Sequence, residues 1–368
     1  DCDTRIRTNH PIRYDYSVDW ANYYHDYYFK TIQKFDFVAG GVIWNFVDFN
    51  SEGRDDAIPH VNLKGMLTQD RKPKDLYYYY QSKLRKTPVV KILPTLSENR
   101  SGVQDSLNPS VCTQRIWVYA NVENPLLTAN GKAIVQAETN DGKTYFDVPF
   151  QAGENTLVAT VSKDGKIYTD LQKVNFSLLP RLLNNADFAF RPIYINCGVH
   201  YSYTDNMGQV WMPDQEYRNG SWGYIGGKMH IRSNKITPGE GKDILGTTDD
   251  PLFQTQHVGE CAYQIDVPNG DYEVTLYFAE ILSKRDREKL LNLLTSDKDE
   301  TLTTRIFNVS INENKVIENL NIAKSYGESR PVVIKFPTSV NNDNGIKIDL
   351  QAIKGDPVIN AIEVRLVY

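Results

Sequence analysis

The chain has 368 residues, more than one typical domain holds, so two or three domains are expected. With 40% hydrophobic and 24% charged residues, the composition is that of a globular protein. A net charge of −5 and the lack of a Lys/Arg-rich tract argue against a nucleic-acid partner. No apolar run approaches the roughly 20 residues that span a membrane, so no membrane partner is expected.

The first residue is Asp1 and no signal-peptide pattern follows, from which we expect a processed or shortened form of a longer protein. Four cysteines are scattered without C-x-x-C spacing: Cys2, Cys112, Cys197 and Cys261. This spacing argues against zinc, and we expect no metal and no cofactor. Isolated buried thiols are favoured over a disulfide, for which three connectivities stay open.

Residues 1–92 read as helix, strand, loop and helix. Ser17 is a candidate N-cap for a helix over residues 17–35, whose Trp20 and tyrosines recur at spacings of three and four. The apolar run FVAGGVIWNF (37–46) predicts a strand covered on both faces, and KDLYYYYQSKL (74–84) predicts a second helix. This order is typical of a piece of an α/β barrel or doubly wound sheet, and one strand leaves the piece incomplete.

The remaining chain is predicted to be β-rich. Pro, Ser, Asn and Gly mark residues 93–112 as a linker, and short alternating runs over 113–180 predict an immunoglobulin-like sandwich with a hairpin turn at Asp164-Gly165 and another at 140–142. Residues 187–368 alternate again, for example in the strand 270–281, which predicts a jelly roll. A charged helical insertion is expected at 282–304.

The first segment resembles the C-terminal end of the catalytic barrel of glycoside hydrolase family 2, the β-galactosidase and β-glucuronidase family. The resemblance rests on GGVIWNFVDF (40–49), NLKG (62–65) and LTQDRKPKDLYYYYQSKL (67–84). It implies that residues 1–92 are the end of a TIM (β/α)8 barrel, whose active site lies at the C-terminal ends of the strands. Residues 93–182 then correspond to an immunoglobulin-like spacer.

Enzymes of this family are retaining glycosidases, which need two carboxylates about 5 Å apart. The family's nucleophile lies in a Ser-Glu-Tyr-Gly motif and its acid/base Glu follows an Asn; neither motif occurs here. The resemblance therefore implies that both catalytic Glu lie upstream, that this chain contains no catalytic residue, and that it is inactive alone. The alternative is that acids within one loop do the chemistry, namely Asp48, Glu52, Asp55 or Asp56.

Three residues of this segment are candidate substrate contacts. Trp44 matches the family aromatic on which the sugar stacks, although it could instead pack the end of the barrel. Asn62 and Lys64 are two residues apart on an extended loop, so their side chains are expected to point the same way. They match the Asn-x-Lys motif with which β-glucuronidases hold the sugar carboxylate. The alternative is a solvated Lys beside a turn-forming Asn, which leaves a β-galactoside or a β-glucuronide as substrate.

The last segment, 183–368, resembles a malectin-type carbohydrate-binding domain. YINCG (194–198), YTDNMGQVWMPDQEY (203–217) and GDPVINAIEVRLVY (355–368) carry much of this resemblance. By position it implies a sugar site made of Tyr201, Tyr203, Trp222, Tyr224 and Asp356. The run HVGECAY (257–263) departs from the pattern, with small residues where malectin has rings. Either a working sugar site or the fold alone is retained.

Together these patterns favour the C-terminal portion of an exo-acting retaining β-glycosidase with an accessory carbohydrate-binding module. The alternatives are a non-catalytic carbohydrate-binding protein and a structural set of sandwiches that mediates dimerisation. The expected partners are an oligosaccharide or polysaccharide, the missing N-terminal part of the same enzyme, and a second copy in a homo-oligomer. Resemblance alone implies a periplasmic or secreted bacterial setting. The run 37–46 should dock on the missing barrel, rearrange or be poorly ordered, because it would otherwise expose apolar surface.

Overall fold

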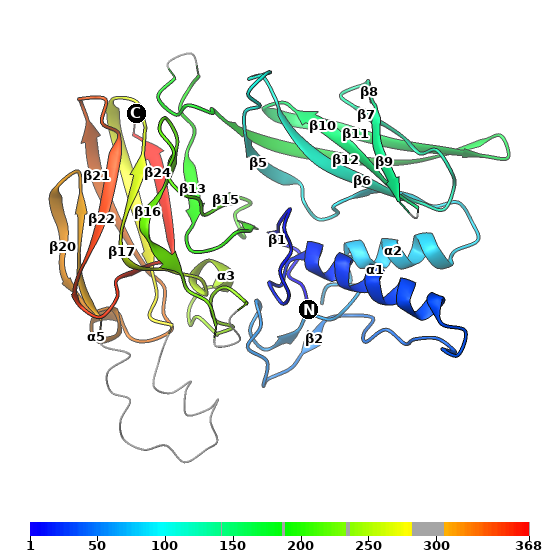
Figure 1. Cartoon of the computed structure of the whole chain (residues 1–368), viewed down its shortest axis with the longest axis horizontal. Coiled ribbons are helices and arrows are strands. Elements are labelled where there is room, and N and C mark those ends of the chain that lie inside the picture. The colour runs from blue at the N-terminus through cyan, green and yellow to red at the C-terminus, as the bar shows by residue number, and fades with distance from the viewer. Residues whose placement is uncertain (141, 186–187, 233–235, 282–304, 368) are drawn as a thin grey trace. The chain divides into compact units, whose positions relative to one another are not determined.

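The computed structural model describes residues 1–368 except 141, 186–187, 233–235, 282–304 and 368 (Figure 1). Most of the regular structure is β-strand, and the chain divides into two compact units. Unit 1 comprises residues 1–52 and 61–181, and unit 2 comprises residues 53–60 and 182–368. The predicted insertion at 282–304 lies outside the described residues, and the domain boundaries at 92 and 182 stay predictions. No helix within the described ranges is long and apolar enough to cross a membrane.

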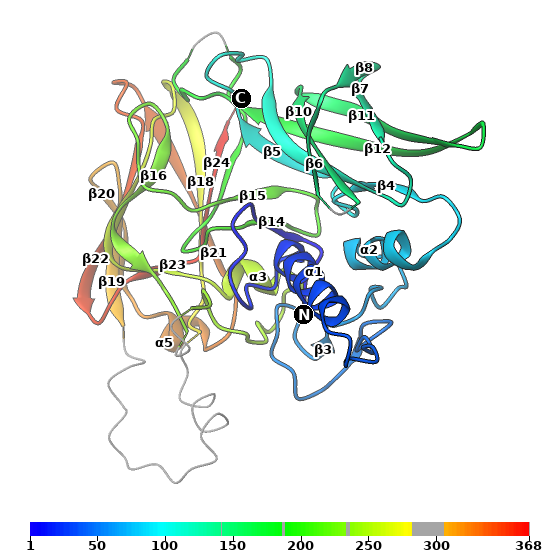
Figure 2. The ribbon, with the colours of Figure 1, turned by 45° about the vertical axis from the view of Figure 1, so that its right-hand side comes forward.

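Both predicted helices of unit 1 are confirmed, as α1 (Val18–Lys34) and α2 (Asp75–Leu84). Ser17 is the N-cap of α1, since its Oγ accepts a hydrogen bond of 3.0 Å from the Trp20 amide. The two helices lie side by side in both views (Figures 1 and 2), and Val18 and Ala21 of α1 pack in one apolar cluster with Leu76 of α2. Three short strands belong to the same region: β1 (Ile6–Arg7), β2 (Phe49–Asn50) and β3 (Val61–Asn62).

The strand predicted over residues 37–46 is not formed, and this prediction was wrong. A strand is held by hydrogen bonds to its neighbours, and no described strand pairs with residues 37–44. The run is therefore irregular and exposed, with Val42 entirely solvent-accessible.

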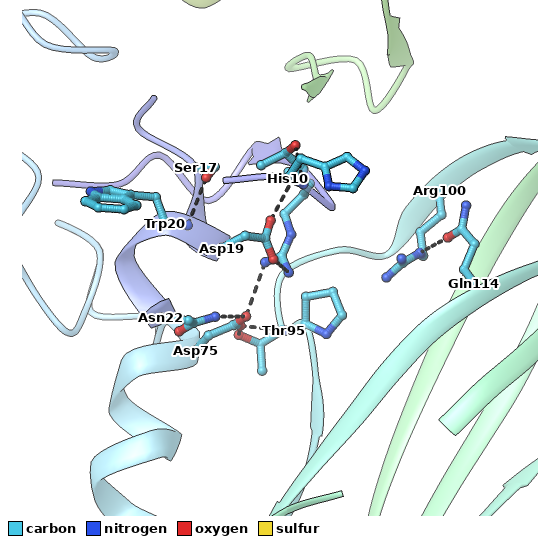
Figure 3. A network of polar contacts seen from close by, with 12 residues as sticks. His10, Ser17, Asp19, Trp20, Asn22, Asp75, Thr95, Arg100 and Gln114 are labelled. Atoms are coloured by element: carbon cyan, nitrogen blue, oxygen red, sulfur yellow. Dashed lines mark hydrogen bonds and ion pairs between the residues drawn. The ribbon is translucent and has the colours of Figure 1, made fainter. Parts of the chain in front are cut away.

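A network of ion pairs and hydrogen bonds joins α1, α2 and Thr95 (Figure 3). Arg7 donates from Nη2 to Asp19 Oδ1 at 2.9 Å and from Nη1 to Asp75 Oδ2 at 3.2 Å. The Thr95 amide and hydroxyl donate to Asp75 Oδ1 at 2.8 and 2.7 Å. Burial raises the pKa of Asp19, and the Arg7 guanidinium opposes that rise. Asp75 begins α2, so the network fixes the start of that helix and the residue before it, Lys74.

The β-sandwich predicted for the middle segment is present in unit 1. Among the described residues its two sheets have the strand orders β4-β6-β10-β9 and β5-β12-β11-β7-β8. The strands are β4 (Val90–Leu93), β5 (Asn99–Val103), β6 (Cys112–Ala120), β7 (Leu126–Ala129), β8 (Lys132–Ile134), β9 (Gln136–Asn140), β10 (Lys143–Phe150), β11 (Gly153–Lys163) and β12 (Lys166–Leu179). Between the sheets lies an apolar core in which Phe150 and Phe176 stack with ring centroids 5.1 Å apart.

Two sequence predictions for the sandwich have different outcomes. The turn Asp164-Gly165 joins β11 to β12, and both residues have positive φ (51° and 75°), as a two-residue hairpin of the favoured twist requires. The predicted linker 93–112 instead contains β5, which pairs in parallel with β12. Its polar composition hid a strand because β5 lies at an edge of its sheet, where part of the strand faces solvent.

Unit 2 is also a sandwich of two sheets, as far as it is described, with strand orders β14-β15-β13-β24-β18-β21 and β16-β17-β22-β19-β20 and with β23 beside β17. Its elements are β13 (Ile193–Asn196), β14 (Ser202–Thr204), β15 (Val210–Pro213), β16 (Trp222–Met229), α3 (Asp250–Phe253), β17 (His257–Ile265), β18 (Gly270–Phe278), β19 (Ile306–Ile311), β20 (Asn314–Leu320), α5 (Ile322–Tyr326), β21 (Val332–Val340), β22 (Ile346–Lys354), β23 (Val358–Ile359) and β24 (Ala361–Leu366). The alternating residues Tyr272, Val274, Leu276 and Phe278 are buried in its core, as predicted. All four cysteines of the chain are free and buried, which confirms the expectation of isolated thiols.

Candidate functional site

Two stretches of unit 1 lie side by side and form a surface that we call the wall, residues 44–50 and 61–67. The Asn45 amide donates to the Lys64 carbonyl at 3.1 Å, and the Met66 amide donates back to the Asn45 carbonyl at 3.1 Å. Further along, Phe49 of β2 lies opposite Asn62 of β3 in an antiparallel pair. This backbone pairing brings the three predicted substrate contacts of the first segment, Trp44, Asn62 and Lys64, into neighbouring positions of the backbone.

A buried ion pair supports the wall. Lys74 Nζ lies 2.7 Å from Asp48 Oδ2, and the two side chains are only 1% and 4% exposed. Burial raises the pKa of Asp48, and the neighbouring Lys74 ammonium opposes that rise. Asp48 Oδ1 also accepts a hydrogen bond of 2.8 Å from the Gly65 amide. A Cβ at Gly65 would lie 2.2 Å from the Asp48 amide nitrogen, so only glycine fits this close approach.

Sequence reasoning assigned no role to Lys74. The signal was available, because Lys74 closes the run DRKPK (70–74) directly before the predicted helix. Its ammonium also donates to the carbonyls of Cys2 and Leu63, at 3.3 and 3.2 Å. Lys74 thus ties the segment before α2 to both sides of the wall.

Asn62 and Lys64 carry side-chain donors for which the structure gives no acceptor among the described residues. Asn62 is buried, and its Oδ1 accepts a hydrogen bond of 3.1 Å from the Lys64 amide, which leaves the Nδ2 group as its donor. Lys64 is half-buried, and no carboxylate of the described residues pairs with its ammonium. An amide N–H and an unpaired ammonium are the complement of a carboxylate. Whether both side chains point the same way stays a prediction.

Trp44 is exposed on the wall, with 68% of its surface accessible. The edge of its ring faces Phe49, with the ring centroids 6.4 Å apart. Within the described chain the Trp44 side chain is therefore not buried in a core. An exposed indole offers an apolar face of the kind that binds the C–H face of a pyranose.

The four acids of the loop do not form a described pair of facing carboxylates. Asp48 is held by Lys74 in unit 1, and Asp56 is paired with Arg54 in unit 2, with Arg54 Nε 2.7 Å from Asp56 Oδ2. Glu52 and Asp55 are exposed. A retaining glycosidase needs two carboxylates poised across the scissile bond, and this arrangement does not supply them within the loop.

Three of the aromatic residues that the resemblance assigns to a sugar site in unit 2 are buried. Trp222 is 1% exposed and belongs to the core of unit 2. Tyr203 is fully buried and its hydroxyl donates to Asp249 at 2.7 Å, and Tyr201 is 5% exposed. Sequence position placed these rings in loops, but Tyr203 and Trp222 lie in strands β14 and β16 and pack inward. A ring without a free face cannot stack on a sugar.

Tyr224 and Asp356 remain accessible. Tyr224 is half-buried with its ring centroid 4.4 Å from that of His257, and Asp356 is exposed. Strand β17 lies between them. Its Tyr263 pairs with Tyr224 of β16, and its other end pairs with β23, which begins two residues after Asp356. These two residues are the candidates that the structure leaves for a sugar site on unit 2.

An ion pair that sequence reasoning missed holds the chain at Asp356. Arg305 Nη1 donates to the Asp356 carbonyl at 3.0 Å, and Arg305 Nε lies 2.7 Å from Glu280 Oε2. Glu280 is completely buried, so this pair fixes the backbone from which the Asp356 carboxylate projects. Within the part of the chain that the structure describes, no group of three or more His, Cys, Asp or Glu could hold a metal ion.

The chain is similar to several known proteins. Residues 192–364 match the malectin domain family. A crystal structure of a Bacteroides uniformis β-glucuronidase is 30% identical with a TM-score of 0.86, and the match covers all of this chain and 40% of that one. Bacteroides uniformis β-glucuronidase 2, covalently bound to cyclophellitol-6-carboxylate aziridine, matches with the same identity, TM-score and coverage.

A curated relative adds a second organism. A Formosa agariphila protein, named provisionally as a β-glucuronidase, is 29% identical over 170 residues, 43% of this chain and 20% of the relative. The chain thus spans less than half the length of the relatives it matches. Its resemblance to β-glucuronidases, which are glycoside hydrolases, and to malectin domains is confirmed.

Proposed function

We propose that this chain is the C-terminal portion of a retaining exo-acting glycoside hydrolase of family 2 that cleaves terminal β-linked glucuronides from glycans. One observation carries the choice of glucuronide: Lys64, two residues after Asn62 on the wall, is half-buried, and its ammonium has no carboxylate partner among the described residues. A neutral galactoside gives that ammonium no counter-charge, whereas the carboxylate of a glucuronide does. The relative that forms a covalent complex with a 6-carboxylate compound supports this choice.

In this proposal the wall is the end of a TIM barrel, and both catalytic Glu lie upstream of residue 1. The exposed apolar side chains of residues 14–49 support it, because such a patch on a folded chain calls for a covering partner. They include Tyr23, Tyr27, Phe37, Val42 and Phe46. The rest of the barrel would cover them, and the 368-residue chain alone would hydrolyse nitrophenyl β-glycosides no faster than buffer.

The deciding experiment is turnover of nitrophenyl β-glucuronide and nitrophenyl β-galactoside by the longer enzyme, with and without Lys64→Met. We expect kcat/KM for the glucuronide to fall about 100-fold, since a buried hydrogen bond to a charged group contributes up to about 3 kcal/mol. Galactoside turnover should stay within about twofold. Lys72→Met, an exposed lysine paired with Asp70, is the matched control. Equal loss on both substrates would make Lys64 a structural residue and would overturn the glucuronide assignment.

A second function, carbohydrate binding by unit 2, is favoured by the malectin match over residues 192–364. We propose Tyr224 and Asp356 as its contacts, because they are the accessible members of the predicted set. Titration of the chain with glucose and galactose oligosaccharides, compared with Tyr224→Ala, tests it; no binding by the wild-type chain would reject it. An accessory sugar module also fits a periplasmic or secreted bacterial enzyme, which fractionation of the source cells would test.

A further inference from the structure

The run HVGECAY (257–263), which departs from the malectin pattern, begins strand β17 and places His257 against Tyr224. The His257 side chain is 1% exposed, and its ring centroid lies 4.4 Å from that of Tyr224 with the ring planes 42° apart. Tyr224 lies on the neighbouring strand β16 (Figure 1) and is one of the two accessible candidates for a sugar contact. The buried ring of His257 therefore packs directly against the proposed sugar contact.

Both ring nitrogens of His257 face hydrogen-bond acceptors. Nδ1 lies 3.1 Å from Asp214 Oδ2, and Nε2 lies 2.9 Å from the Gly226 carbonyl oxygen. A neutral imidazole has one N–H and would leave one of these two contacts without a hydrogen, whereas an imidazolium donates to both acceptors. The geometry therefore fits a buried imidazolium–carboxylate pair. Its positive charge lies against the Tyr224 ring, an arrangement in which a cation attracts an aromatic side chain.

The Asp214 carboxylate is held from several sides. Its side chain is 2% exposed, and Oδ2 also accepts hydrogen bonds from the Tyr263 hydroxyl at 2.8 Å and from the Gly198 amide at 2.6 Å. Oδ1 accepts one of 3.1 Å from the Gln215 amide. A buried carboxylate with this many donors keeps one orientation, and it therefore also fixes the His257 ring.

Three glycines of β16 and β17 form a patch beside Tyr224: Gly226, Gly227 and Gly259. Gly227 has a φ of 69°, and a Cβ there would lie 2.6 Å from His257 Nε2, so only glycine fits over the buried ring. A Cβ on Gly259 would lie 3.6 Å from Gly227 Cα, and the Gly259 amide donates to the Pro357 carbonyl at 2.9 Å, directly after Asp356. The glycine patch thus joins the two candidate sugar contacts, and strand glycines often mark a close approach of a ligand to the backbone.

We propose that the His257–Asp214 pair positions Tyr224 and the glycine patch for sugar binding, with His257 as a positioning residue that does not touch the sugar itself. The run 257–263 then replaces the stacking rings of the malectin pattern by a buried charge that holds one ring, Tyr224, in place. Every residue of this support belongs to unit 2. The inference rests on the proposed sugar binding by unit 2 only for its consequence on affinity.

The direct test is the NMR spectrum of the histidine rings in the 368-residue chain prepared with isotope-labelled histidine. The His257 signals are assigned by their loss in His257→Gln. We expect protons on both ring nitrogens of His257 at the pH of the binding measurement. We also expect Tyr224→Leu to shift the ring-proton signals of His257, because it removes the ring current of Tyr224. A neutral His257 ring, or signals that Tyr224→Leu leaves unchanged, would overturn the proposal.

Sugar affinity gives an independent readout. His257→Gln should raise the Kd for a glucose or galactose oligosaccharide that binds the wild-type chain about tenfold, because Tyr224 loses its support. Tyr272→Phe is the matched control: it removes a buried hydrogen bond of 2.8 Å in the other sheet of unit 2, and its Kd should stay within about twofold. An unchanged Kd in His257→Gln, or equal weakening in both variants, would overturn the positioning role. A wild-type chain that binds none of these sugars would reject the proposed sugar binding, and the histidine spectrum would still decide whether His257 holds Tyr224.

Discussion

Trp44 and Trp222 illustrate how differently the two units use the same residue type. Both were predicted as sugar platforms, but Trp44 is 68% exposed on the wall of unit 1, whereas Trp222 is 1% exposed in the core of unit 2. The Trp44 ring meets the edge of Phe49, with the centroids 6.4 Å apart, whereas Trp222 lies among the apolar residues of a sandwich core. The comparison teaches that an aromatic residue in a sugar-binding fold is a candidate contact only where the backbone turns it outward.

The largest expected effect tests the core side of the comparison. Trp222→Ala should lower the free energy of unfolding of unit 2 by about 3–5 kcal/mol, because it removes a large buried side chain and leaves a cavity. Urea unfolding of the chain followed by circular dichroism measures this. Met207→Ala, at an exposed position of the same unit, serves as control and should change little. A Trp222→Ala variant as stable as the wild type would contradict the buried assignment.

Beneath the wall, Lys74→Met should cost about 3 kcal/mol of folding free energy, since it leaves the Asp48 carboxylate buried without its partner. The double variant Asp48→Asn/Lys74→Met should recover part of that loss, because no buried charge remains. Chemical denaturation of the three proteins measures the coupling. The exposed Lys72, two residues earlier, provides a variant that should unfold like the wild type. A single variant with wild-type stability would show that the pair does not hold the wall.

Acid should weaken unit 1 through His25. Burial lowers the pKa of His25 from 6.5 to about 4, and its Nδ1 lies 2.9 Å from the Tyr80 hydroxyl. In the unfolded chain His25 is protonated below pH 6.5, whereas in the folded chain it is protonated only below about pH 4. The stability that neutral His25 contributes is therefore present above pH 6.5 and is lost as pH falls through 4, by up to about 3 kcal/mol. His25→Gln should reduce the dependence of the free energy of unfolding on pH between 6.5 and 4. An unchanged slope would show that another residue causes this pH dependence.

The smallest effect is expected at the exposed tryptophan. Trp44→Ala should change the unfolding free energy by no more than about 0.5 kcal/mol, because little of the side chain is buried. Fluorescence quenching by acrylamide should lose its most accessible component in this variant and keep it in Trp222→Phe. Destabilisation like that of Trp222→Ala would place Trp44 in a packed environment and remove it from the candidate site.

Local patterns sufficed for much of the fold. Three features depend only on residues close together in the chain: the N-cap Ser17, the spacing of the tyrosines in α1 and the Asp164-Gly165 turn. Neighbouring residues therefore suffice to predict them. The strand prediction for residues 37–46 failed for a different reason. Its apolar composition is typical of a strand with a neighbouring strand on each side, and no described strand pairs with it. The edge strand β5 was missed because solvent-facing strands carry polar residues.

The sequence by itself determined the two helices of unit 1, the alternating strands of both sandwiches and the isolated thiols, because short motifs and alternating patterns record local geometry. Only the tertiary structure decided which rings are exposed, that Lys74 pairs with Asp48, and that residues 53–60 belong to unit 2. Burial, ion pairing and unit membership depend on residues far apart in the chain. Asp56 and Gln254 are 198 positions apart, and no local pattern brings them together.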